Sequence, residues 1–253
     1  EAFVGGGTDL FVQKPEAMVK EEIAPMLDNN ALKGITEKDG RCHLGASTTV
    51  TEIAESELMQ RVFPNLPAHL KLVSSTPIRN MATLAGNFVN ASPIGDMTIF
   101  FLALNSSIVL NHNGNRRTLL LKDFYKGYKQ LDKTQEEFIE TIFFDIPQGS
   151  YVFNFEKVSK RTHLDIATVN TACLLQLDDK DTIIEAHVSA GGLAAIPKYL
   201  GETADFLKGK RVEQIALDEV VEVLQTEVSP ISDVRGSKEY KRLLLRQLFY
   251  AHL

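Results

Sequence analysis

Cysteine is scarce in this chain of 253 residues, which contains only Cys42 and Cys173. An iron–sulfur cluster needs about four thiolate ligands, so these two residues cannot hold one. They are also too few for a disulfide framework, and we interpret them as reduced thiols of a cytoplasmic protein. The six histidines show no spacing typical of metal ligands, so we predict no protein-bound metal.

Long apolar runs, a signal sequence and an excess of positive charge are missing as well. No segment approaches the roughly 18 apolar residues that suggest a membrane span, and no basic-then-apolar leader is visible. The formal net charge is −6, whereas a general nucleic-acid binder is normally basic. Neither a G-x-G-x-x-G sequence nor a P-loop sequence occurs. These absences argue against a membrane span, nucleic-acid binding, and Rossmann or P-loop chemistry.

A glycine-rich turn, Gly5-Gly-Gly-Thr-Asp9, directly follows the strand-like residues Ala2–Val4. Because glycine has no Cβ, consecutive N–H groups can converge on an anion there, and the threonine hydroxyl can add a hydrogen bond. A tight turn that needs positive φ explains the same residues equally well, so both interpretations stay open. The abrupt start on a strand end predicts that further residues precede Glu1.

A second polar segment runs from Thr76 to Asp96 between apolar runs. It gathers small polar residues within a stretch of ten: Thr83, Gly86, Asn87, Asn90 and Ser92. Glycine permits close approach of the backbone to a phosphate or a ring, and asparagine supplies both a donor and an acceptor. Asp96 would repel phosphate but suits ribose or ribityl hydroxyls, or an adenine amine. The alternative is a polar connection that caps the next helix, with Asp96 in its first turn.

These two segments lie about 70 residues apart, and a long ligand with a central pyrophosphate, held at both, accounts for the pair. One basic run, Lys157-Val-Ser-Lys160-Arg161, interrupts the otherwise acidic chain. It either stabilises an anionic ring and attracts nucleotide phosphates, or it forms a solvated turn.

The apolar pattern predicts an α+β protein with a boundary near residue 148. Before it we expect helices at 21–30, 50–58, 63–74 and 96–104; Pro25 interrupts the pattern of the first, and a capping box of Thr49 and Glu52 opens the second. Hairpins are expected at 34–46 and 107–121, then a strand at 137–146. After the boundary, strands at 151–158, 169–177 and 183–190 precede helices at 204–207, 212–226 and 240–250.

The chain resembles the FAD-binding domain of molybdenum hydroxylases in two sequences, Gly5-Gly-Gly-Thr-Asp-Leu10 and Ile78-Arg-Asn-Met-Ala-Thr-Leu-Ala-Gly-Asn-Phe-Val-Asn-Ala-Ser-Pro-Ile-Gly-Asp96. That family includes xanthine dehydrogenase and the medium, flavin-carrying subunit of carbon monoxide dehydrogenase. The resemblance continues in order through Tyr151–Arg161, Asp165–Ala167, Ala190–Pro197 and Ser232–Arg242. It therefore covers nearly the whole chain.

This resemblance implies a vanillyl-oxidase-type FAD-binding domain at residues 1–148 and a smaller α+β domain of the carbon monoxide dehydrogenase flavoprotein type at 149–253. It implies no catalytic acid or base. The residues that it implies as FAD contacts are Phe3, Val4, Gly5, Gly6, Gly7, Thr8, Asp9, Leu10, Val73, Thr83, Leu84, Ala85, Gly86, Asn87, Asp96, Ile142 and Lys157. The apolar contact assigned to Ile142 fits Thr141 as well. The family often has Gly-Gly-Asn where this chain has Ala85-Gly86-Asn87, and alanine can serve there if its φ is negative.

In this family a molybdenum cofactor hydroxylates the substrate, and electrons pass through iron–sulfur clusters to FAD and then to NAD, oxygen or another acceptor. The resemblance therefore implies an FAD-carrying electron-transfer component. Its partners would be a [2Fe–2S] subunit or domain and a molybdenum-cofactor catalytic subunit. A stand-alone FAD-binding module and a self-contained flavin oxidase are the alternatives. We expect Lys157, with Lys160 and Arg161, to stabilise reduced anionic flavin or to guide the acceptor's phosphates.

Overall fold

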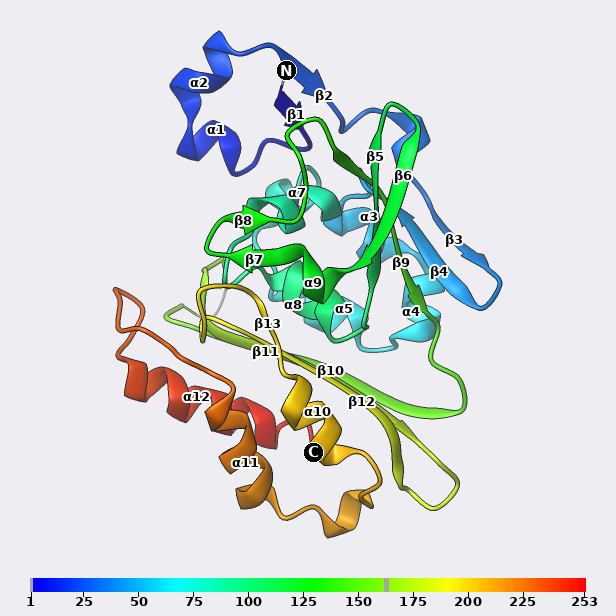
Figure 1. Cartoon of the computed structure of the whole chain (residues 1–253), viewed down its shortest axis with the longest axis vertical. Helices are drawn as coiled ribbons and strands as arrows, with labels where there is room; N and C mark the ends of the chain where they lie inside the picture. Colours follow the sequence, from blue (N-terminus) through cyan, green and yellow to red (C-terminus); the bar gives the residue numbers. More distant parts are fainter. Residues whose placement is uncertain (1, 162–163) are drawn as a thin grey trace.

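The computed structural model describes residues 2–161 and 164–253 and contains two large antiparallel sheets with helices between and around them (Figure 1). The first sheet consists, in spatial order, of β3 (Ile35–Lys38), β4 (Arg41–Gly45), β9 (Phe138–Asp145), β5 (Ser107–His112) and β6 (Asn115–Leu120). The second consists of β10 (Ser150–Ser159), β11 (Ala167–Leu177), β12 (Ile183–Gly191) and β13 (Lys198–Tyr199). The α+β class, both hairpins and the three long strands after residue 148 are confirmed.

The N-terminal end forms a small unit of its own at one end of the molecule (Figure 1). Strand β1 (Ala2–Val4) pairs in parallel with β2 (Ile23–Pro25), and α1 (Leu10–Gln13) and α2 (Pro15–Lys20) connect them. The expected helix at 21–30 is wrong. Its first half is β2, since Pro25 lacks the N–H that a helix interior needs and is tolerated at a strand edge. Its end enters the 3₁₀ turn η1 (Asn30–Leu32), which the Asn29 side chain caps.

Short helices connect β4 to β5. They are α3 (Val50–Glu55), α4 (Glu57–Val62), α5 (Leu66–Lys71), α6 (Thr76–Arg79), α7 (Leu84–Asn90) and α8 (Asp96–Leu102). The capping box of Thr49 and Glu52 is confirmed, with both of its hydrogen bonds formed. Helix α3 ends at Glu55, earlier than expected, because the Ser56 side chain caps α4. The polar segment from Thr76 contains α6 and α7, two helices that we did not predict.

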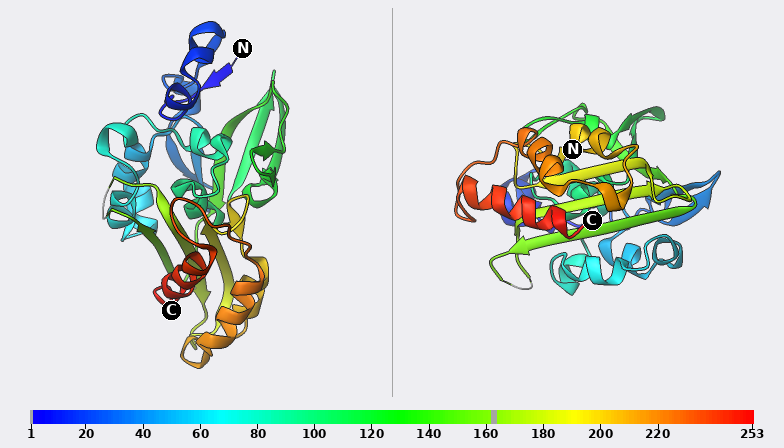
Figure 2. Two further views of the ribbon diagram at one scale, coloured as in Figure 1. Left: turned by 90° about the vertical axis from the view of Figure 1, so that its left-hand side faces the viewer. Right: turned by 90° about the horizontal axis from the view of Figure 1, so that it is seen from below.

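The second sheet is covered on both faces. Helices α5 and α8 pack on one face, and α10 (Gly201–Leu207) and α12 (Lys238–Tyr250) pack on the other, with α11 (Leu217–Thr226) beside them. The view from below shows α12 lying over this sheet (Figure 2). Strand β11 accordingly has a nearly unbroken run of buried residues, in which Ala172 and Leu174 face one core and Cys173 and Leu175 the other.

The remaining elements are short connections: α9 (Leu121–Phe124), β7 (Tyr125–Gly127), β8 (Gln130–Leu131) and the 3₁₀ turn η2 (Val212–Gln214). The expected helix at 212–226 is therefore split into η2 and α11. No helix among residues 2–161 and 164–253 is long and apolar enough to cross a membrane.

The C-terminal end closes over the second sheet through His252, whose Nε2 lies 2.8 Å from the hydroxyl oxygen of Thr171 on β11. Its Nδ1 is buried and has no partner among the described residues. Burial, reinforced by the neighbouring His69 on α5, lowers the pKa of His252 to about 3. The imidazole is therefore neutral in the folded chain at any pH well above that value.

We expect the free energy of unfolding to fall as the pH drops from about 6.5, where the unfolded histidine starts to bind a proton, towards 3. Each pH unit costs about 1.4 kcal/mol for one such group, so pH 5 costs about 2 kcal/mol relative to pH 7. Urea unfolding at both pH values measures the loss. His252→Gln should remove this part of the pH dependence, whereas the exposed His112→Gln should keep it. Equal pH slopes in all three proteins would contradict the prediction.

Candidate functional site

A cavity of about 2220 Å³ runs along the two polar segments and continues towards the second sheet. It is larger than the roughly 300–1,000 Å³ of ordinary small-molecule sites, so it has room for a long ligand. It brings together most of the site residues expected from the sequence: Phe3, Gly5, Gly6, Gly7, Thr8, Asp9, Leu10, Val73, Thr83, Ala85, Gly86, Asn87 and Asp96.

Four of the expected residues do not line this cavity. Val4, Leu84 and Ile142 are buried in the protein interior, each at most 3% exposed. Thr141, the alternative to Ile142, is not in the lining either. Lys157 lies behind the lining, where its side chain pairs with Asp96. The structure therefore places these four residues outside the cavity lining.

The glycine turn packs directly on the second segment. A Cβ on Gly5 would lie 2.3 Å from the hydroxyl oxygen of Thr83, and one on Gly6 would lie 1.6 Å from the carbonyl oxygen of Met81. Gly7 has a φ of +67°, which L side chains rarely adopt. The three glycines therefore serve two purposes: Gly5 and Gly6 permit close approach of the two segments, and Gly7 makes the turn.

The backbone N–H groups of the glycine turn are the next feature of the site. No group among residues 2–161 and 164–253 accepts a hydrogen bond from the N–H of Gly6, Gly7 or Thr8. All three residues line the cavity. Consecutive backbone N–H groups in a turn form a concavity that binds anions. This geometry would let the turn accept an anion that enters the cavity.

The backbone N–H groups of the second segment donate hydrogen bonds to other groups of the protein. At the start of α7, the N–H of Leu84 donates to the Thr48 carbonyl, that of Ala85 to the Ala46 carbonyl, and that of Gly86 to the Thr83 hydroxyl. Ala85 lies in right-handed helix, so its replacement of the family's glycine causes no strain. These N–H groups are not available to a phosphate, and the segment instead supports the glycine turn.

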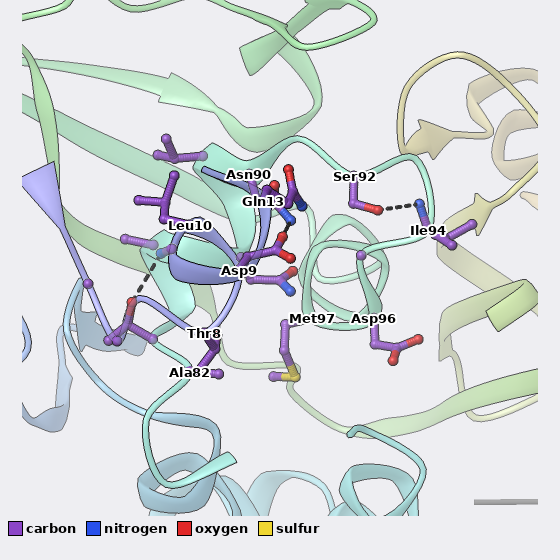
Figure 3. Close-up of a pocket in the computed structure, with 18 of the residues that line it drawn as sticks. Thr8, Asp9, Leu10, Gln13, Ala82, Asn90, Ser92, Ile94, Asp96 and Met97 are labelled. Carbon is purple, nitrogen blue, oxygen red and sulfur yellow. Dashed lines mark hydrogen bonds between the residues drawn. The ribbon is translucent and has the colours of Figure 1, made fainter. Parts of the chain in front are cut away.

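Two amide side chains of α7 face the site. Asn87 accepts hydrogen bonds from the N–H of Thr98 at 3.0 Å and from its hydroxyl at 2.9 Å, which fixes the amide and leaves its NH₂ at the lining. Asn90 donates to the carboxylate of Asp9, and Figure 3 shows this pair beside Gln13. The pair therefore ties the last residue of the glycine turn to α7.

Asp96 is one of the charged residues that line the cavity, and Figure 3 shows it apart from Asp9. Its Oδ2 accepts from Lys157 Nζ at 2.6 Å, and its Oδ1 accepts from Asn170 Nδ2 at 2.7 Å. Lys157 also donates to the Leu72 carbonyl at 2.9 Å, and its side chain is only 3% exposed. Burial raises the pKa of Asp96, and the two donors oppose that rise.

The structure places the three basic residues of the run Lys157–Arg161 in different environments. Lys157 is a buried strand residue and not part of a solvated turn. Lys160 and Arg161 are exposed; they bind the Val234 carbonyl and the Asp165 carboxylate. Of the three, Arg161 lines the cavity. Within this run, Lys157 contacts Asp96, which lines the cavity.

Comparison with known proteins identifies the family to which this chain belongs. Residues 2–148 match the FAD binding domain in molybdopterin dehydrogenase, and residues 155–253 match the CO dehydrogenase flavoprotein C-terminal domain. The chain belongs to the FAD-binding family of molybdopterin dehydrogenases. The matched domain binds FAD, so the cofactor of this chain is FAD.

The relatives are subunits or parts of larger enzymes. The chain is 24% identical to the nicotinate dehydrogenase FAD-subunit of Eubacterium barkeri and 26% identical to the carbon monoxide dehydrogenase medium chain of Afipia carboxidovorans. These alignments cover 98% and 94% of this chain and 85% and 82% of the relatives. Xanthine dehydrogenase 1 of Arabidopsis thaliana is 27% identical over 96% of this chain, which spans only 19% of that protein.

The fold agrees with these sequence matches. The reconstituted CO dehydrogenase from Oligotropha carboxidovorans superposes with a TM-score of 0.91, over 99% of this chain and 87% of that one, at 23% identity. At that identity the match establishes the α+β fold and no residue roles.

The residues present fit FAD. The three N–H groups of the glycine turn that have no acceptor among the described residues suit a diphosphate, which carries negative charge and only acceptor oxygens. Asp96 and the Asn87 amide suit the hydroxyl groups and ring heteroatoms elsewhere in the molecule. Asn170, which we did not predict, is buried behind the lining and contacts the cavity residue Asp96. It lies 74 residues beyond Asp96, and only the strand register brings the two together.

Proposed function

We propose that this chain carries the FAD of a molybdenum hydroxylase and relays electrons from [2Fe–2S] clusters of a partner to NAD or another acceptor. The observation that supports this most directly is the row of N–H groups at Gly6, Gly7 and Thr8, which line the large cavity and have no acceptor in the part of the chain that the structure describes. Bound FAD would supply the redox chemistry, and the residues of the chain would bind and orient it.

The chain's own residues have distinct tasks in this proposal. The glycine turn would bind the FAD diphosphate through its N–H groups, and Thr83 and Met81 would hold that turn in place. Asp96, fixed by Lys157 and Asn170, would accept hydrogen bonds from FAD hydroxyl groups. Val73 and Phe3 would contribute apolar contact. Binding, orientation and electrostatics are the contributions that a flavin site requires of its protein.

The wider assembly is part of the same proposal. A [2Fe–2S] subunit or domain and a molybdenum-cofactor subunit would complete the enzyme, because relatives named medium chain and FAD-subunit are parts of larger enzymes. We propose a division near residue 148 between a FAD-binding and a C-terminal domain. A cytoplasmic location is also proposed, and it rests on the two unpaired, buried cysteines, Cys42 and Cys173.

Purification from the cells that make the protein, followed by metal analysis and rapid mixing, tests the relay. We expect iron and molybdenum to accompany the chain, and flavin absorbance to bleach when the reduced [2Fe–2S] partner is added. Flavin with neither metal would favour a stand-alone FAD module. Bleaching of the isolated chain by a substrate alone would favour a flavin oxidase. Either of these two results would contradict the relay.

A further inference from the structure

Lys157, Asn170 and Gly191 form a row across three strands of the second sheet. Lys157 on β10 is the direct register partner of Asn170 on β11, and Asn170 is the partner of Gly191 on β12. Side chains of such partners point to the same face of a sheet. The first two residues of the row reach the same carboxylate, that of Asp96 at the start of α8, one at each oxygen.

The orientation of the Asn170 amide is fixed by charge. Its Nδ2 donates to Asp96 Oδ1 at 2.7 Å and to the Ile94 carbonyl at 3.3 Å. A flipped amide would point its oxygen at a carboxylate and at a carbonyl, and both contacts would be repulsive. The oxygen Oδ1 must therefore point the other way, towards β12.

On the side of β12 there is space for the Oδ1 of Asn170, but no described residue gives it a hydrogen bond. Asn170 is fully buried, and its Oδ1 has no hydrogen-bond partner among the described residues. A Cβ on Gly191 would lie only 2.1 Å from this oxygen, so glycine alone leaves room for it. An unpartnered buried acceptor is costly, and an apolar residue of the same size would avoid that cost. We therefore expect the Asn170 side chain to have a function that compensates for this cost in stability.

We propose that Asn170 is a positioning residue for the cofactor site, which holds the Asp96 carboxylate so that its remaining lone pairs face the hydroxyl groups of FAD. This inference rests on the proposed function of the cavity. Lys157 and Asn170 each occupy one carboxylate oxygen, so Asp96 can rotate only by breaking a buried hydrogen bond. The donors also favour the ionised carboxylate, which is the better acceptor.

The test measures FAD affinity of the purified chain between pH 5 and 9 by flavin fluorescence. Asn170→Ala should weaken binding about tenfold at pH 7, which corresponds to about 1.4 kcal/mol. Without its amide donor the pKa of Asp96 rises, so the pH below which affinity is lost should move upwards. Asn170→Asp has the same shape and fits beside Gly191. It should cause a larger upward shift, because it places a second carboxylate against the first.

A merely structural role would lower the melting temperature of the FAD-free chain and leave the pH midpoint of binding unchanged, and that result would overturn the proposal. Asn154→Ala is the matched control, since it removes an amide from β10 away from the cavity and should bind FAD within about twofold of the wild type. If Asn170→Ala does not fold, Asn170→Asp alone decides. If the folded wild type itself fails to bind FAD, the proposed function fails with it. Wild-type binding with unchanged variants refutes only the role of Asn170.

Discussion

Replacement of Gly6 by alanine should lower the affinity for FAD about hundredfold, which corresponds to about 2.7 kcal/mol. The new Cβ would lie 1.6 Å from the Met81 carbonyl oxygen, and a backbone atom cannot yield as a flexible side chain does. The glycine turn must therefore move away from the second segment. That movement misdirects the N–H groups of Gly6, Gly7 and Thr8, whose hydrogen bonds to a charged group are worth about 1.5–3 kcal/mol each.

Gly201→Ala is the matched control for this experiment. It adds the same methyl group in the first turn of α10, where the nearest atom would lie 3.8 Å away and φ is not positive. Fluorescence titration with FAD and the melting temperature of the FAD-free chain should be recorded for both variants. We expect normal affinity in Gly201→Ala. Normal affinity in a folded Gly6→Ala would show that the turn does not bind the cofactor.

Lys157→Met should lower the free energy of unfolding of the FAD-free chain by about 3–5 kcal/mol, the usual cost of leaving a buried charge without its partner. The ammonium and the Asp96 carboxylate are only 2.6 Å apart, and both side chains are largely shielded from water. Loss of the cation raises the pKa of Asp96 further, so protonation should relieve part of this cost at lower pH. Urea unfolding at pH 5 and pH 7 measures both effects.

Two further variants make the interpretation specific. Lys160→Met removes an exposed cation from the same strand end and should cost no more than about 0.5 kcal/mol. Lys157→Met combined with Asp96→Asn removes both charges and should recover much of the lost stability. If Lys157→Met were as stable as Lys160→Met, Lys157 would not hold Asp96, and its role near the cofactor would have to be direct.

The glycine turn and the second segment could be predicted from the sequence because their signals are local. Three consecutive glycines indicate a special backbone, and small polar residues cluster from Thr83 onwards. The division of labour between them was not predictable. Whether the N–H groups of Leu84 and Ala85 are free depends on the carbonyls of Thr48 and Ala46, which only the folded chain brings near.

The features that the sequence did not predict were mainly short helices and contacts between residues far apart in the chain. A helix was expected at 21–30 from its apolar spacing, but pairing with β1 and the ring of Pro25 outweigh that preference. Helix α7 has a sequence signal that could have been used, since Thr83 is a good N-cap before Leu84. Asn170 has no such signal. Its contact with Asp96 depends on strand register and on the packing of α8 against β11.

The central claim, that the glycine turn and Asp96 hold FAD in this cavity, is tested most directly by the purified chain itself. After incubation with FAD and removal of the excess, its visible absorption is recorded and the chromophore released by denaturation is identified by chromatography. We predict flavin bands, and release of FAD at about one molecule per chain. A folded chain that stays colourless and takes up no FAD would contradict the account, and the glycines would then serve only to let the two segments pack.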